Sequence, residues 1–98
     1  MEIFTNKNES ELVIRVEGRL DTTTAPKLEG ELKQSIADIT SLIFDFEKLE
    51  YISSAGLRVL LLAQKVMNKQ GNMVVTNVKD SVMEVFEVTG FQDLLTIE

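Results

Sequence analysis

The possible folds of this chain are narrowed first by a short apolar strand that is followed closely by a long amphipathic helix. Residues 42–46 form a strongly apolar segment, typical of a strand that is buried on both faces. After an exit loop expected at residues 47–50, the pattern predicts a helix from residue 54 to about residue 68, with Gly71 as a left-handed cap. This succession indicates an α/β domain in which strands alternate with helices.

The rest of the chain extends the alternation in both directions. The expected strands cover residues 2–5, 12–17, 42–46, 73–76 and 94–97, and the expected helices cover residues 25–38, 54–68 and a third segment that ends at Gly90. Gly18 is expected to end the second strand. The order ββαβαβαβ predicts one domain over residues 1–98, with helices packed on a mixed sheet whose later strands are parallel.

Composition excludes several classes of function. The 98 residues include no cysteine and no histidine, which removes thiolate nucleophiles, Ser-His catalysis and histidine-based metal sites. We expect no metal and no cofactor. A net charge of −6, with cations scattered among acids, disfavours nucleic acid. The longest apolar run has five residues and the N-terminus is no signal peptide, so we expect a cytoplasmic protein without a membrane span.

Two adjacent hydroxyls, Ser53 and Ser54, stand where the loop turns into the helix. A helix start offers free backbone N–H groups and the positive end of the helix dipole. A serine at this place can be an ordinary N-cap. It can also be a site for a phosphate, because this end of a helix favours anions. The residues alone leave both interpretations open.

The periodicity of the helix predicts a second, mixed face. Its core side is expected to hold Gly56, Val59, Leu60, Ala63, Val66 and Met67. An outer strip on the face of Ser54 is expected to hold Arg58, Leu61, Leu62 and Lys65. Exposed apolar residues beside cations indicate a protein contact. The alternative is that another part of the fold covers Leu61 and Leu62.

Topology is expected to bring a second loop to the serines. If the strands that end near Gly18 and Phe46 are parallel neighbours, their carboxyl ends lie at one edge of the sheet. The loop over residues 21–24 would then lie beside Ser53 and Ser54, at the edge where ligands of open α/β sheets bind. Its threonines precede Pro26, so helix capping alone is the alternative role for them.

Three segments of the sequence resemble the STAS domain family, most closely its small stand-alone bacterial anti-sigma factor antagonists. They are residues 18–21 (Gly-Arg-Leu-Asp), residues 43–46 (Ile-Phe-Asp-Phe) and residues 51–57 (Tyr-Ile-Ser-Ser-Ala-Gly-Leu). The resemblance implies that Ser54 is phosphorylated by a partner that is both a serine kinase and an anti-sigma factor. It implies that the unphosphorylated form binds this partner and frees the sigma factor, and that a phosphatase resets the switch.

The resemblance also implies that Asp21 contributes to partner contacts. Ser53 stands where the family commonly has an acid, so Ser53 is the alternative modified residue. The family often continues into a further helix after the last strand, and this sequence stops at Glu98. The full set of expected partner-binding residues is Asp21, Thr22, Thr23, Ser53, Ser54, Arg58, Leu61, Leu62 and Lys65.

Two other classes of function are less compatible with the sequence or remain open. An enzyme is disfavoured because no histidine can activate either serine, and Lys65 lies about three helical turns from Ser54. A STAS-type scaffold, a ligand sensor or a lipid-transport module that is not switched at Ser54 is the remaining alternative, since function does not follow from fold. A module that forms transient contacts is expected to be a monomer.

Overall fold

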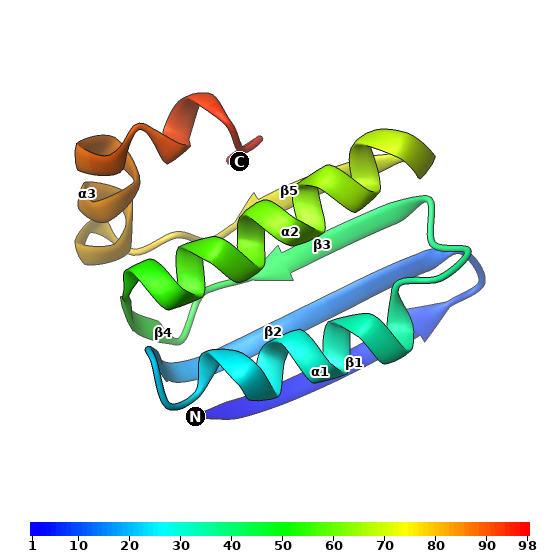
Figure 1. Cartoon of the computed structure of the whole chain (residues 1–98), viewed down its shortest axis with the longest axis horizontal. Helices are drawn as coiled ribbons and strands as arrows, with labels where there is room; N and C mark the ends of the chain where they lie inside the picture. The colour runs from blue at the N-terminus through cyan, green and yellow to red at the C-terminus, as the bar shows by residue number, and fades with distance from the viewer.

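A mixed β-sheet forms one layer of the structure, and two helices lie side by side across one of its faces (Figure 1). The structure is a computed structural model that describes all 98 residues. The main sheet has the order β1-β2-β3-β5, and β4 pairs with the far end of β2. Strand β1 is antiparallel to β2, and all other pairs are parallel.

The elements follow the periodic patterns of the sequence. The strands are β1 (Glu2–Asn8), β2 (Glu11–Leu20), β3 (Ser41–Asp45), β4 (Leu49–Ile52) and β5 (Asn72–Thr76). The helices are α1 (Ala25–Ser35), α2 (Ser54–Gln70), α3 (Asp80–Thr89) and a short 3₁₀ turn, η1 (Phe91–Asp93). The prediction of an α/β fold with helices packed on a mixed sheet is therefore confirmed. No helix of the chain is both long and apolar enough to cross a membrane.

The core lies between the sheet and helices α1 and α2. It is a single cluster of 23 apolar residues, and no polar or charged residue is buried. Alternate residues of β2 point into it, as do Leu28 and Leu32 from α1. On α2, Leu57 is buried, although the helical periodicity had not placed it on the core side. Val66, which had been placed there, is only half-buried.

Three expected strand assignments are wrong. Residues 49–50 belong to β4 and not to an exit loop, because Leu49 is buried and pairs with Gly18 of β2. Strand β2 does not end at Gly18 either; this residue has φ 97° and marks a shift of register, so the strand bends and continues to Leu20. The expected last strand is reduced to a single bridge between Val75 and Ile97, since residues 91–93 form a 3₁₀ turn.

The helix ends also depend on contacts from distant residues. Helix α1 ends at Ser35 and not at residue 38. Just after this end, the side-chain amide of Gln70 donates to the carbonyls of Ile36 and Ile39. Gly71 is not a left-handed cap, because its φ of 172° is extended. A Cβ at Gly71 would instead collide with the backbone of Thr40. Gly90 is left-handed, with φ 80°, as the sequence predicts.

Candidate functional site

The carboxyl ends of β2 and β4 bring the two polar segments together. Leu20 and Ile52 are parallel partners, and the N–H of Ser53 donates to the carbonyl of Leu20 over 2.9 Å. Asp21 and Ser54 therefore follow neighbouring strands at the same edge of the sheet. The expected convergence is present, but β4 produces it. Strand β3 pairs with β2 only as far as Arg15 and ends well short of this edge.

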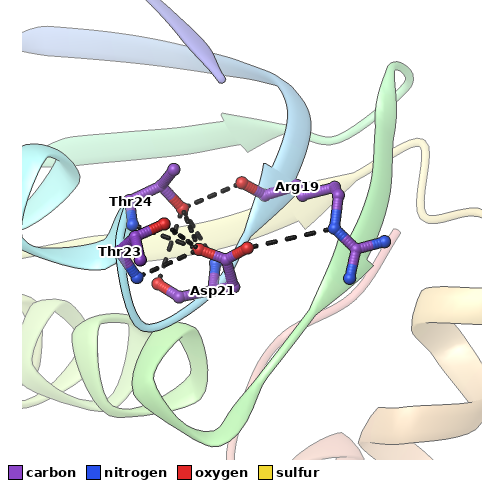
Figure 2. A network of polar contacts seen from close by, with 4 residues as sticks. All are labelled: Arg19, Asp21, Thr23 and Thr24. Atoms are coloured by element: carbon purple, nitrogen blue, oxygen red, sulfur yellow. Dashed lines mark hydrogen bonds and ion pairs between the residues drawn. The ribbon is translucent and has the colours of Figure 1, made fainter.

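Asp21 organises its loop through hydrogen bonds (Figure 2). Its carboxylate oxygen Oδ1 accepts the N–H of Thr23 at 3.0 Å, the hydroxyl of Thr23 at 2.8 Å and the N–H of Thr24 at 3.2 Å. The Thr23 hydroxyl is the main cause of a pKa of Asp21 below its ordinary value, because this bond favours the charged form. The loop therefore presents a fixed carboxylate.

The threonines have separate roles in this loop. Thr24 is the N-cap residue of α1, yet its hydroxyl makes no capping bond; it donates to the carbonyl of Arg19 and accepts the N–H of Asp21. Thr23 ties down the carboxylate of Asp21. Thr22 is exposed and lines a shallow hollow together with Arg58 of α2. Capping alone thus does not describe the threonine run.

The two serines differ in their surroundings. Ser53 is the N-cap residue of α2, but its hydroxyl makes no capping bond, and its Oγ is buried without a hydrogen-bond partner. Ser54 is the first residue of the helix and is exposed. A macromolecular partner can therefore reach the Ser54 side chain, while the Ser53 hydroxyl is shielded.

Gly56 sets the position of the helix start. A Cβ at this residue would lie 2.7 Å from Cγ of Leu20 and 2.8 Å from Cγ1 of Ile52, well inside ordinary van der Waals contact. The missing side chain lets the first turn of α2 rest directly on the ends of β2 and β4. Leu57, which is 4% exposed, anchors the same turn in the core. The Ser-Ala-Gly-Leu corner is thus a packing device that holds Ser54 at the sheet edge.

The outer strip of α2 is largely as the helical periodicity predicts. Arg58 and Lys65 are exposed, and Leu62 is 36% exposed. Leu61 is half-buried. The residues continue from Ser54 at helical spacing along one face of α2. They form a mixed apolar and basic surface that begins at the site.

Two site residues were missed by sequence reasoning. The guanidinium of Arg19 lies 4.2 Å from the ring centre of Tyr51, and its Nε is 3.9 Å from Oδ2 of Asp21. Arg19 and Tyr51 are register partners of β2 and β4. Both lie inside the segments that resemble the STAS family, but their contact depends on a strand pairing that the sequence did not reveal.

The chemistry of the edge is that of a binding or modification surface. It offers the exposed residues Ser54 and Thr22 with their hydroxyls, the fixed carboxylate of Asp21, and the cations Arg19 and Arg58. The structure contains no group of three or more acidic side chains that could hold a metal ion.

Comparisons with known proteins agree with this fold. The STAS domain family model matches residues 2–98. BtrV of Bordetella bronchiseptica, described as an anti-sigma factor antagonist, is 34% identical over 99 residues, which cover 99% of this chain and 85% of that protein. An anti-sigma factor antagonist from Mycobacterium paratuberculosis has a TM-score of 0.88 at 23% identity, covering 98% of this chain and 83% of its own. The phosphorylated form of Bacillus SpoIIAA has a TM-score of 0.77 at 20% identity, and the match covers 99% of this chain and 91% of that chain.

Proposed function

The chain belongs to the STAS domain family, and we propose that it is an anti-sigma factor antagonist that is switched by phosphorylation of Ser54. In this proposal the unphosphorylated form binds an anti-sigma factor that is also a serine kinase and thereby frees a sigma factor. Phosphorylation ends the binding, and a phosphatase restores it.

The observation that carries the proposal is the contrast between the two serines. Ser54 is exposed at the first turn of α2, whereas the Oγ of Ser53 is enclosed by protein. A kinase must bring the hydroxyl oxygen against the γ-phosphate of ATP, which requires access to that oxygen. Exposure therefore supports Ser54 over Ser53 as the modified residue.

The surroundings of Ser54 suit a switch that acts without refolding. A phosphoserine adds about −1.5 to −2 charges and three acceptor oxygens. The free N–H groups at the start of α2 would stabilise this charge, so the fold should persist. The unphosphorylated and phosphorylated forms of SpoIIAA have nearly equal TM-scores to this chain, 0.78 and 0.77, which supports a fold that accepts both states.

The partner interface would not tolerate the same charge. Asp21, held ionised by its threonine bonds, already places one negative charge at this edge. A phosphate buried there without a matching cation costs several kcal/mol. A tenfold loss of affinity needs only about 1.4 kcal/mol. One phosphate is therefore sufficient to release the partner.

The remaining parts of the proposal follow from this role. The proposed partner-binding surface comprises Asp21, Thr22, Thr23, Ser54, Arg58, Leu61, Leu62 and Lys65. Ser53, which the sequence analysis had included, is left out because its hydroxyl is enclosed by protein. The role asks for no catalytic group, metal or cofactor of this chain. The protein would act as a monomer in the bacterial cytoplasm, where sigma factors and the transcription machinery operate.

Capture from native cell extract tests the proposal. The wild-type protein should retain an ATP-binding serine kinase, and mass spectrometry should find phosphate on Ser54 after ATP is added. The Ser54→Asp variant should keep an unchanged circular dichroism spectrum and lose the kinase. Ser53→Ala is the matched control and should be captured and phosphorylated normally.

Other outcomes would contradict the proposal. Full kinase binding by the Ser54→Asp variant, or phosphate on Ser53, would show that Ser54 is not the switch. Capture of only structural proteins or lipids would favour a scaffold or lipid-transport module. Turnover of ATP or a phosphate ester by the pure protein, abolished in Ser54→Ala, would indicate an enzyme.

A further inference from the structure

A second surface feature lies beside the site, between β4 and α3. It is an open hollow of about 380 Å³ that no other part of the chain fills. The residues that line it are Tyr51, Ser81, Glu84, Val85, Val88 and Thr89. Val88 is 82% exposed, the largest exposed fraction among the big apolar residues, and Tyr51 is 39% exposed. Apolar side chains left this open on a small domain indicate a contact surface.

The helix that lines one side of the hollow is acidic. Helix α3 carries Asp80, Glu84 and Glu87 and no basic residue. None of these acids forms an ion pair within the chain. Glu84 lines the hollow directly, so the rim formed by α3 is acidic and its carboxylates are free, whereas Arg19 lies over the Tyr51 ring on the β4 side. The complementary ligand is an apolar group with cations next to it.

Arg19 connects the hollow to the phosphorylation edge. Its guanidinium lies 4.2 Å from the ring centre of Tyr51. Its Nε lies 3.9 Å from Oδ2 of Asp21 (Figure 2). Tyr51 is both a wall of the hollow and the register partner of Arg19. A protein that contacts Ser54 and Asp21 can reach the hollow across a single strand. Ser54 itself does not line it.

We propose that this hollow binds an apolar side chain from a lysine- or arginine-rich segment of the anti-sigma factor, as a second contact next to the Ser54 edge. The inference rests on the proposed function. Nucleic acid and anionic membranes are disfavoured as occupants because their phosphates would face an acidic rim on a chain of net charge −6. The hollow supplies affinity, whereas Ser54 supplies the switch.

Titration calorimetry with the purified anti-sigma factor tests this contact. Val88→Asp should weaken binding of the unphosphorylated protein by roughly tenfold or more, because it replaces an exposed apolar side chain of the hollow with a carboxylate. Glu84→Lys should weaken it as well, through repulsion of the basic segment. The matched control is Leu94→Asp, which alters an apolar residue that is 53% exposed and does not line the hollow. This control should bind like the wild type.

The outcomes separate the two proposals. If the wild type binds and Val88→Asp binds equally well, the hollow is not a contact and the Ser54 switch is unaffected. If Ser54→Asp binds normally while Val88→Asp does not, the switch fails and the hollow stands. If the wild type does not bind the anti-sigma factor at all, the proposed function fails. A second probe then tests whether the hollow binds an apolar, basic segment.

That second probe is a short amphipathic peptide of lysine and leucine, titrated into the ¹⁵N-labelled protein. The expected result is a set of amide shift changes centred on Tyr51, Val85 and Val88 that is absent from the Val88→Asp variant. A peptide in which glutamate replaces lysine is the matched control and should leave these amides unchanged. Shift changes elsewhere, or equal changes with both peptides, would overturn the inference.

Discussion

Replacing Gly56 by alanine tests whether the start of α2 is held against the strand ends by the absence of a side chain. An alanine Cβ would approach Leu20 to 2.7 Å and 3.1 Å and Ile52 to 2.8 Å, where ordinary contacts begin at 3.4 Å. Either the side chains of Leu20 and Ile52 or the first turn of α2 must therefore shift. A shift of the turn would also displace Ser54, which lies in it.

The magnitude follows from two opposing terms. Alanine is favoured over glycine inside a helix by about 1 kcal/mol. Overpacking a core contact costs about 1–3 kcal/mol, and three close approaches place Gly56 in the upper part of this range. We expect a net loss of about 1–2 kcal/mol, which lowers the melting temperature of a domain of this size by roughly 4–16 °C.

Gly30 provides the matched control within the same protein. It lies in α1, is exposed, and has no atom within 4 Å of an added Cβ. Gly30→Ala should therefore gain about 0.5–1 kcal/mol from helix propensity alone. Thermal and urea unfolding followed by circular dichroism measure both variants. If Gly56→Ala proves as stable as Gly30→Ala, the close packing of the corner is refuted.

Three further predictions concern single residues. Gly71→Ala should destabilise the protein by about 3 kcal/mol or more in urea unfolding, because its Cβ meets the rigid backbone of Thr40; a loss under 1 kcal/mol would contradict this contact. Ser53→Ala should leave the free energy of unfolding unchanged or raise it by about 1 kcal/mol, because the buried hydroxyl of Ser53 is unpaired. A decrease of about 1 kcal/mol, typical of a removed N-cap, would show that the hydroxyl does cap the helix. Thr23→Val should raise the pKa of Asp21 toward its ordinary value in a carboxyl NMR titration. The pKa of Asp21 is lower in the folded than in the unfolded state, so ionised Asp21 stabilises the fold above the ordinary carboxyl range. This stabilisation is lost as the pH falls through the folded pKa. An unchanged pKa of Asp21 in Thr23→Val would refute the role of the hydroxyl.

The proposed switch combines a local and a distant requirement. The helix start that accepts a phosphate is local, since it needs only the N–H groups of the first turn of α2. The proposed discrimination against the phosphate depends on Asp21, which is far from Ser54 in sequence and lies at the same sheet edge because β2 pairs with β4.

Much of the fold could be predicted because its causes are local. Apolar residues recur every two residues in β2, β3 and β5 and every three to four residues in the three helices. These elements form where the pattern indicates. Gly90 ends α3 with a left-handed residue for the same local reason. The errors lie where short segments depend on a partner: four residues of β4 carry too little pattern to be distinguished from a loop, and residues 94–97 keep only one bridge to β5.

The sequence by itself determined the α/β alternation, the exposed face of α2 with Arg58 and Lys65, and the placement of two serines at a helix start. Only the tertiary structure decided that β4 places Ser54 at the same sheet edge as Asp21, that Gly56 packs against Leu20, and that the Ser53 hydroxyl is enclosed. The reason is physical. Periodicity indicates which side of an element faces the core. Accessibility and contacts between distant residues depend instead on strand register and on differences of a few tenths of an ångström in packing distance. No single segment of the sequence determines these.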